Sequence, residues 1–376
     1  MLQDPSFTVG IEEEYLLVQR SDWDLVADPP ETVFDDCKRV LGDQVTHEFL
    51  RCQIEVGTSV CQSVGEARSQ LAHMRACLHE ATEPHGLALM ASSTHPFAEW
   101  DKLVHTDKER YNALADDLKM VVARLVICGM HVHIGIEDDN LRIDLMQQLS
   151  YFMPHLLAVT TSSPFWRGNE TGLHSYRLSV FDELPRTGLP EAFASYAEYT
   201  RTIETLVNVG LIEDATKVWW DLRPSNKFPT LEMRICDVCT TVDDAAAVAA
   251  LFQCLARMLW RLRRGNQRWR SYARFLVEEN RWLAQRHGVS GSLVDFGKRS
   301  RVPVTELIDE LIAMLAEDAD ALGCEKELNH LQTIGQRGTS AERQLALFHQ
   351  KLEAGSSAQG ALRDVVRFLV DETIAV

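Results

Sequence analysis

Hydrophobic and polar residues alternate with a period of two in several short stretches of the first 240 residues, which predicts β-strands. These strands are expected at residues 7–18, 49–60, 87–93, 129–136, 217–223 and 231–237. Between them, apolar residues recur at intervals of three and four, the spacing of an amphipathic helix. One such helix is marked by Val64, Ala67, Leu71, Met74 and Leu78. Strands and helices mixed in this way predict an α+β fold.

The pattern becomes helical after Asp243, with apolar residues at helical spacing over 248–262, 304–322, 341–353 and 360–370. Two earlier helices are expected at 111–121 and 141–160. No linker rich in Pro, Gly or Ser divides the chain, so we expect one domain over residues 1–376. It would have a sheet-bearing part (1–240) and a helical part (241–376).

The first strand carries three glutamates in the stretch GIEEEY, residues 10–15. Side chains alternate faces along a strand, so Glu12 and Glu14 point one way and Glu13 the other. A charged carboxylate removed from water costs several kcal/mol unless it is paired. Glu12 and Glu14, roughly 6–7 Å apart, could hold two neighbouring cations or two sides of one. A solvated strand face is the alternative.

Three other predicted strands repeat this arrangement of polar residues on one face and apolar residues on the other. The polar pairs are His131 with His133 in GMHVHIG, Gln53 with Glu55 in HEFLRCQIEVGT, and Glu232 with Arg234 in TLEMRICD. For the histidines alone, a role as satisfied core residues stays open. If the strands are neighbours in one sheet, they form a polar bowl with five glutamates, the fifth being Glu48.

Five carboxylates cannot all ionise at close range without cations, because like charges raise one another's pKa. Carboxylates with one imidazole suit Mg²⁺ or Mn²⁺ rather than zinc. Nearby arginines then require an anion, and metal, arginine and a flexible loop together are typical of phosphoryl transfer. Neither a P-loop nor a G-x-G-x-x-G motif occurs, so metals and arginines would have to hold the phosphates of ATP.

Composition narrows the class of protein. The formal net charge of −17 argues against nucleic acid as a partner. No apolar run of 18 residues and no signal peptide are evident, so no membrane partner is expected. Nine scattered cysteines suit reduced thiols and a cytoplasmic location. The lone C-x-x-C of residues 236–239, CDVC, favours two buried thiols over a zinc site.

A long segment at residues 162–190 is rich in Gly, Ser and Pro and carries several arginines. Long segments without regular structure inside compact domains are usually functional or disordered. The aromatic residues Phe165, Trp166 and Tyr176 argue against disorder.

Taken together, these stretches resemble the glutamine synthetase superfamily, and more closely the carboxylate–amine ligases of the glutamate–cysteine ligase type 2 family. The resemblance covers about residues 10–344, in family order. The matching pieces are GIEEEY, HEFLRCQIEVGT, GMHVHIG, SPFWRGNETGLHSYR, WWDLRPS, TLEMRICD and IGQRGTSAERQL. It implies a curved, mainly antiparallel sheet with helices outside. Unlike glutamine synthetases, the chain begins directly at the first metal strand, which is similar to ligases that use an amino compound instead of ammonia.

The resemblance also implies residue roles. Two Mg²⁺ or Mn²⁺ ions would be bound, one by Glu14, Glu48 and Glu55 and the other by Glu12, His131 and Glu232. His133 would lie near the nucleotide phosphates, and Arg234 and Arg223 would contact the transferring phosphoryl group or the acid substrate. In the 162–190 segment, which would cover the intermediate, Arg167 and Arg177 are the candidates for binding amino acid carboxylates.

The implied activity is ATP-dependent amide formation between the side-chain carboxylate of glutamate, or a similar acid, and an amino compound such as cysteine, through an acyl phosphate. Its partners would be small-molecule substrates, and the superfamily suggests a homo-oligomer. Three other functions stay open at this stage: a guanidino-type phosphotransferase, a metal-dependent amidohydrolase, and a non-catalytic sensor of an amino acid or nucleotide.

Overall fold

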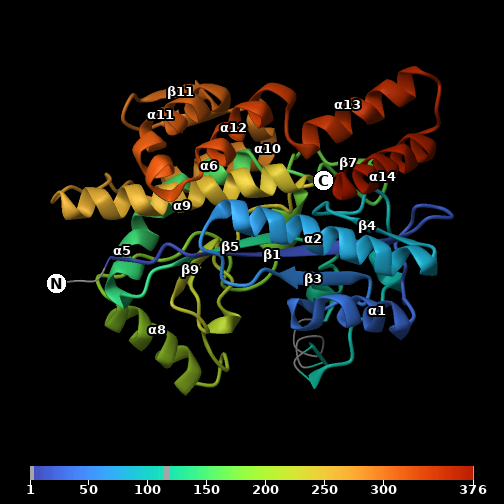
Figure 1. The fold of residues 1–376 in the computed structure, drawn as a ribbon, viewed down its shortest axis with the longest axis horizontal. Coiled ribbons are helices and arrows are strands. Elements are labelled where there is room, and N and C mark those ends of the chain that lie inside the picture. The colour runs from blue at the N-terminus through green and yellow to red at the C-terminus, as the bar shows by residue number, and fades with distance from the viewer. Residues whose placement is uncertain (1–3, 110, 113–118, 376) are drawn as a thin grey trace.

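A seven-stranded sheet lies at the centre of the computed structural model, which describes residues 4–109, 111–112 and 119–375 (Figure 1). The strand order is β2-β3-β1-β5-β9-β8, with β4 also paired to β1, and every pairing is antiparallel. The strands are β1 Val9–Gln19, β2 Val45–His47, β3 Gln53–Gly57, β4 Leu87–Met90, β5 Met130–Gly135, β8 Leu222–Pro224 and β9 Thr230–Met233. The predicted mixed fold with a mainly antiparallel sheet is confirmed.

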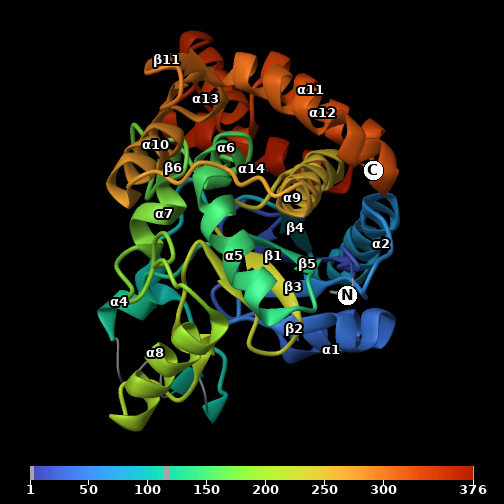
Figure 2. The same cartoon turned by 90° about the vertical axis from the view of Figure 1, so that its left-hand side faces the viewer.

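Helices surround this sheet. Those of the first 240 residues are α1 Glu31–Leu41, α2 Val64–Thr82, α4 Met120–Ala123, α5 Asp139–Leu149, α6 Met153–Ala158, α7 Tyr176–Phe181 and α8 Tyr196–Asn208. The C-terminal helices gather on one side of the sheet, in yellow to red in Figures 1 and 2. They are α9 Val242–Arg264, α10 Arg274–His287, α11 Val304–Leu322, α12 Glu325–Arg337, α13 Ser340–Glu353 and α14 Ala358–Ile374.

Several boundaries differ from the predictions. The helix expected over 141–160 is split into α5 and α6 by a 3-10 turn, and Pro154 in the first turn of α6 lacks the N–H that would continue a single helix. The strand expected at 217–223 begins only at Leu222. The C-terminal third is not purely helical, because Ser292–Asp295 (β10) and Ser300–Pro303 (β11) form a hairpin. The helix predicted over 111–121 lies largely outside the described residues.

The apolar face of the sheet packs against helices α2 and α9, which contact each other and β1. By length and composition alone α9 could cross a membrane, but 78% of its apolar window is buried inside the protein, as in a core helix. Its N-terminus is capped by Thr241, whose side chain accepts a hydrogen bond from the backbone N–H of Asp244. The C-terminal helices therefore complete the core behind the sheet.

A buried ion pair crosses this core and accounts for the middle glutamate of GIEEEY. Glu13 and Arg75 of α2 are both fully buried, and two hydrogen bonds of 2.8 and 3.1 Å join their carboxylate and guanidinium groups. The hydroxyl of Tyr15 also donates to Glu13. Burial, and then the neighbouring charge of Glu13, raise the pKa of Tyr15, so its hydroxyl stays protonated and remains a donor.

The remaining donors of Arg75 reach two distant segments. Its guanidinium donates to the carbonyls of Cys239 at 2.8 Å and Thr240 at 2.6 Å, just before α9, and to that of Thr373 in α14 at 3.4 Å. One side chain thus joins β1, α2, the entry to α9 and the last helix. The charges are buried but hydrogen-bonded on all sides, which is the condition under which a buried pair is tolerated.

We expect Arg75→Met to lower the free energy of unfolding by about 3–5 kcal/mol, because it leaves Glu13 buried without a partner. Arg68→Met on the same helix is the matched control. Arg68 pairs with Asp243 at side-chain exposures of 30% and 52%, so its loss should cost less than about 1 kcal/mol. Urea unfolding of both variants measures the difference, and equal losses would contradict the assigned role of Arg75.

Candidate active site

Strand register brings the predicted polar residues together on the sheet face opposite α2 and α9. Along β1, Glu12 lies directly opposite His131 of β5, and Glu14 lies opposite Glu55 of β3. Side chains of directly paired residues stand about 4.5–5.5 Å apart at Cβ, so each pair meets. The next pairing places Glu232 of β9 between its partners His133 of β5 and Arg223 of β8.

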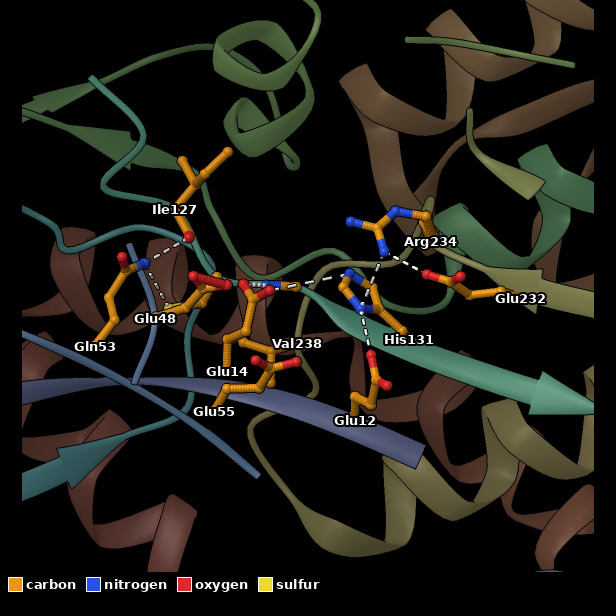
Figure 3. Close-up of polar contacts among 12 residues, drawn as sticks. Glu12, Glu14, Glu48, Gln53, Glu55, Ile127, His131, Glu232, Arg234 and Val238 are labelled. Atoms are coloured by element: carbon orange, nitrogen blue, oxygen red, sulfur yellow. Dashed lines mark hydrogen bonds and ion pairs between the residues drawn. The ribbon is translucent and has the colours of Figure 1, made fainter. Parts of the chain in front are cut away.

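These side chains line one cavity of about 360 Å³. Figure 3 shows two groups along it: Glu14, Glu48 and Glu55 lie together, and His131 lies between Glu12 and Arg234, with Glu232 beyond. The site residues predicted from sequence that line the cavity are Glu12, Glu14, Glu48, Glu55, His131, His133, Arg177, Arg223, Glu232 and Arg234.

One trio has the chemistry of a metal site. Donor atoms of Glu12, His131 and Glu232 lie within 4.8 Å of one another, and they are the only such trio found among the described residues. The Nδ1 atom of His131 lies 3.0 Å from Glu12 Oε2, and His133 Nε2 lies 3.5 Å from Glu12 Oε1. Burial by itself raises the pKa of Glu12, but the hydrogen bonds with the two histidines outweigh it and hold that pKa far below its usual value.

Glu232 is neutralised by two arginines. Arg223 donates to both oxygens of its carboxylate, at 2.9 and 3.1 Å, and Arg234 Nη1 also contacts it. Although burial raises the pKa of Glu232, the charges of Arg234 and Arg223 outweigh that effect and lower it well below the ordinary range. A cation at this trio would therefore compete with guanidinium groups for Glu232, so metal and arginine positions are linked.

The carboxylates of the second predicted trio accept hydrogen bonds from the protein. Glu14 accepts a hydrogen bond from the backbone N–H of Gly129 at 2.7 Å, Glu55 accepts one from Thr46 Oγ1 at 3.0 Å, and Glu48 accepts one from the N–H of Phe49. Burial, and then the charges of Glu48, Glu12 and Glu14, raise the pKa of Glu55 well above its usual value. Acidic oxygen donors that repel one another fit a hard divalent cation, which would let all of them ionise.

The structure does not bring Arg167 to this cavity. It occupies the two-residue turn between β6 (Phe165–Trp166) and β7 (Asn169–Glu170) with a φ of +50°. That turn is exposed, and the guanidinium of Arg167 donates to Glu99 at 2.6 Å. Arg177 in α7, by contrast, is buried and lines the cavity.

Two lysines of the cavity were missed in the sequence. Lys227 lies in the β8–β9 hairpin between the strands that carry Arg223 and Glu232, and Lys217 lies shortly before β8. Lys227 could have been predicted, because it lies in the short loop between two strands that were both expected to carry site residues. No periodic pattern marks Lys217.

Solved structures with the same fold are ligases. The glutamate–cysteine ligase of Francisella tularensis, solved in complex with AMP, matches with a TM-score of 0.69 and 12% identity over 100% of this chain and 90% of that chain. The bifunctional glutathione synthetase of Pasteurella multocida matches with a TM-score of 0.69 and 14% identity over 97% of this chain and 52% of that one. The chain thus shares its fold with these two ligases.

The chain belongs to glutamate-cysteine ligase family 2, whose profile matches residues 8–368. A relative from Rhodospirillum rubrum, provisionally named glutamate–cysteine ligase 2, is 59% identical over 378 residues, covering 100% of this chain and 97% of the relative. A Jannaschia protein with the same provisional name is 53% identical over 98% of this chain and 97% of its own length. The chain is therefore an ATP-dependent C–N ligase.

Glu55 gives a pH-dependent prediction. Because its pKa is raised in the folded state, the folded protein holds this proton more tightly than the unfolded one. The resulting stability is fully present below the ordinary carboxyl pKa of about 4.3 and is lost as pH rises through the raised value. Glu55→Gln should therefore be more stable than the wild type at neutral pH without divalent cations, and its stability should change less with pH.

With Mg²⁺ added, the wild type should become more stable than Glu55→Gln. A ligand at 100 times its Kd stabilises a protein by about 2.7 kcal/mol, and Glu55→Gln should gain clearly less than the wild type. Thermal unfolding with EDTA and with Mg²⁺ at several pH values tests both statements. If Mg²⁺ stabilised the two proteins equally, Glu55 would not be a metal ligand.

Proposed function

We propose that this ligase joins the side-chain carboxylate of glutamate, or a similar acid, to the amine of cysteine or a similar amino compound. ATP would supply the energy and leave as ADP and phosphate. The observation that carries the proposal is the single cavity in which a carboxylate–imidazole trio lies beside the arginines that contact Glu232. Family membership supports the pair of substrates.

Two groups of this chain's residues would hold Mg²⁺ or Mn²⁺: Glu12 with His131 and Glu232, and Glu14 with Glu48 and Glu55. A bound divalent cation supplies charge neutralisation and orientation of phosphate oxygens. The donor set fits, because five carboxylates and two imidazoles line the same cavity and no thiolate is needed.

The reaction would proceed in two displacements. An oxygen of the acid's carboxylate attacks the γ-phosphorus of ATP, the bond to the β-phosphate oxygen breaks, and ADP leaves. The amine nitrogen then attacks the carbonyl carbon of the acyl phosphate, inorganic phosphate leaves with the carbon–oxygen electron pair, and the nitrogen loses a proton. In both displacements negative charge develops on phosphate oxygens, which Arg223, Arg234 and His133 would stabilise.

Arg177 would bind a carboxylate of the amino acid substrate. A guanidinium matches a carboxylate with two parallel hydrogen bonds, which a lysine cannot reproduce.

We also propose that residues 1–376 act as one catalytic domain. In support, Arg281 of α10 in the helical part pairs at 2.7 Å with Asp221, two residues before Arg223.

The decisive test is ADP release by the purified protein with ATP and Mg²⁺ over a matrix of acids and amines, including glutamate with cysteine and each alone. ADP release that requires both partners is the expected result. Release with one partner would indicate a phosphotransferase, and amide hydrolysis without ATP would indicate an amidohydrolase. Binding of ATP or an amino acid without turnover would indicate a sensor.

Substitutions test the residue roles. Glu232→Gln should lower turnover at least about 100-fold, because it removes a carboxylate shared by the metal trio and both arginines. Glu170→Gln is the control, because the side chain of this exposed glutamate of β7 pairs with His349 and lies outside the cavity lining. Wild-type turnover by Glu232→Gln would refute the metal assignment.

Arg177→Lys should raise the KM for the acid or amine substrate about 10- to 100-fold, the loss expected for a charge-assisted hydrogen-bond pair, with little change in the KM for ATP. Arg167→Lys, outside the cavity, should change neither constant. Steady-state kinetics with one substrate varied at a time measures the contrast. Equal increases in both KM values for Arg177→Lys would assign this arginine to the nucleotide instead.

A further inference from the structure

Arg177 is a buried arginine that forms no direct ion pair with a carboxylate among the described residues, although the charges of Asp237 and Asp221 act on it from farther away. Its exposed fraction is 2%, and no carboxylate lies within 4.0 Å of its guanidinium among the residues that the structure describes. The buried arginines Arg75 and Arg281 differ, since each is held by at least one carboxylate. A buried, unpaired cation is costly, so its retention in a cavity wall points to an anionic ligand.

The guanidinium of Arg177 is only loosely satisfied by the protein. It donates to the backbone carbonyls of Ile235 at 3.3 Å and Arg234 at 3.2 Å, both long for charge-assisted hydrogen bonds. Its Nε atom is buried and has no hydrogen-bond partner among the described residues. The guanidinium therefore keeps N–H donors on Nη1 and Nη2 that the described residues do not use.

The guanidinium of Arg177 occupies the space that a side chain at residue 129 would fill. A Cβ atom on Gly129, the residue before β5, would lie 2.4 Å from Nη2 and 3.0 Å from Cζ of Arg177. Only glycine leaves that space open. The same Gly129 N–H donates to Glu14 at 2.7 Å, so the arginine lies beside a residue that contacts the acidic group of the cavity.

The segment that carries Arg177 is fixed by one buried carboxylate, Asp237 of the CDVC stretch. Asp237 is fully buried and accepts three hydrogen bonds: from Ser162 N at 2.8 Å, Ser163 Oγ at 2.7 Å and Ser175 Oγ at 2.8 Å. The Oγ of Ser163 in turn accepts a hydrogen bond from the backbone N–H of Arg177 at 3.1 Å. Asp237 therefore fixes both ends of the segment 162–175 close to Arg234 and Ile235, whose carbonyls accept from the guanidinium.

We propose that Asp237 is a positioning residue, which acts through Ser163 and Ser175 to hold the Arg177 guanidinium over Gly129 as a preformed receptor for a substrate carboxylate. The proposal depends on the proposed function only in taking the bound carboxylate to be that of the substrate. Preorganisation of this kind raises affinity because the ligand does not have to order its own receptor. The three hydrogen bonds that Asp237 accepts account for the aspartate between the buried residues Cys236 and Cys239.

The test measures binding rather than turnover. Calorimetry gives the Kd of the wild type for L-glutamate, L-aspartate, succinate and glutarate in the presence of Mg²⁺ and ADP, and the tightest of them is the probe. Asp237→Asn should weaken the probe at least 10-fold and change the Kd of ADP less than 2-fold. Asp318→Asn is the matched control, a fully buried carboxylate paired with arginines of α9, and it should change neither value.

A double-mutant cycle separates positioning from general structure. In an Arg177→Ala background, Asp237→Asn should weaken the probe less than 2-fold further, because its effect runs through the missing guanidinium. An equal loss in both backgrounds, or no loss in the wild-type background, would overturn the proposal. If Asp237→Asn does not fold, Ser163→Ala and Ser175→Ala each remove one hydrogen bond and should show the same dependence on Arg177, with losses of three- to ten-fold.

The two proposals fail differently. A wild type that binds the probe but releases no ADP with any acid and amine would reject the proposed ligation while the cycle still tests Asp237. A wild type that binds none of the four carboxylates would overturn the receptor role of Arg177 and Asp237.

Discussion

The burial of Glu13 against Arg75 is the constraint on which the site depends. Strand side chains alternate, so fixing Glu13 on the core side of β1 fixes Glu12 and Glu14 on the other side. A one-residue slip of β1 would expose Ile11 and Tyr15 and move the ion pair out of its hydrogen bonds, which the fold cannot tolerate. Because β1 pairs with β3, β4 and β5, its register sets the positions of Glu55 and His131 as well.

The two faces of the sheet differ in how the charges of their side chains are paired. On the core side the charges of Glu13 and Arg75 are balanced within the protein and contribute to a unique packing. On the cavity side Glu14 and Glu55 lie directly opposite each other, a like-charge pairing that opposes folding. Arg177 is a buried cation whose guanidinium contacts no carboxylate directly among the described residues. Charges without a direct partner are typical of sites whose ligands complete them, and they exchange stability for function.

The segment 162–190 is held to the rest of the protein by buried hydrogen bonds and ion pairs. Buried serines fasten its first half to Asp237, and His174 Nδ1 lies 3.1 Å from Glu342 of α13. Near its C-terminal half, Asp182 pairs with Arg281 of α10 at 2.8 Å. The segment is therefore a connector between the C-terminal helices and the cavity. Its serines make buried hydrogen bonds, and Gly168, Gly172 and Gly188 adopt positive φ.

The sequence by itself determined which faces the residues of four strands occupy, because the period of two is local and needs no knowledge of neighbours. It also predicted α9, α11, α13 and α14 from their sustained apolar periodicity, whereas α10 and α12 were not predicted. Only the tertiary structure decided which strands are adjacent, that Arg223 and Arg234 share Glu232, and that Arg177 reaches the cavity while Arg167 does not. The partner of Glu13 was equally hidden, because Arg75 lies 62 residues away in an ordinary amphipathic helix. Pairings between distant segments are set by how elements pack, and no local pattern in the chain records them.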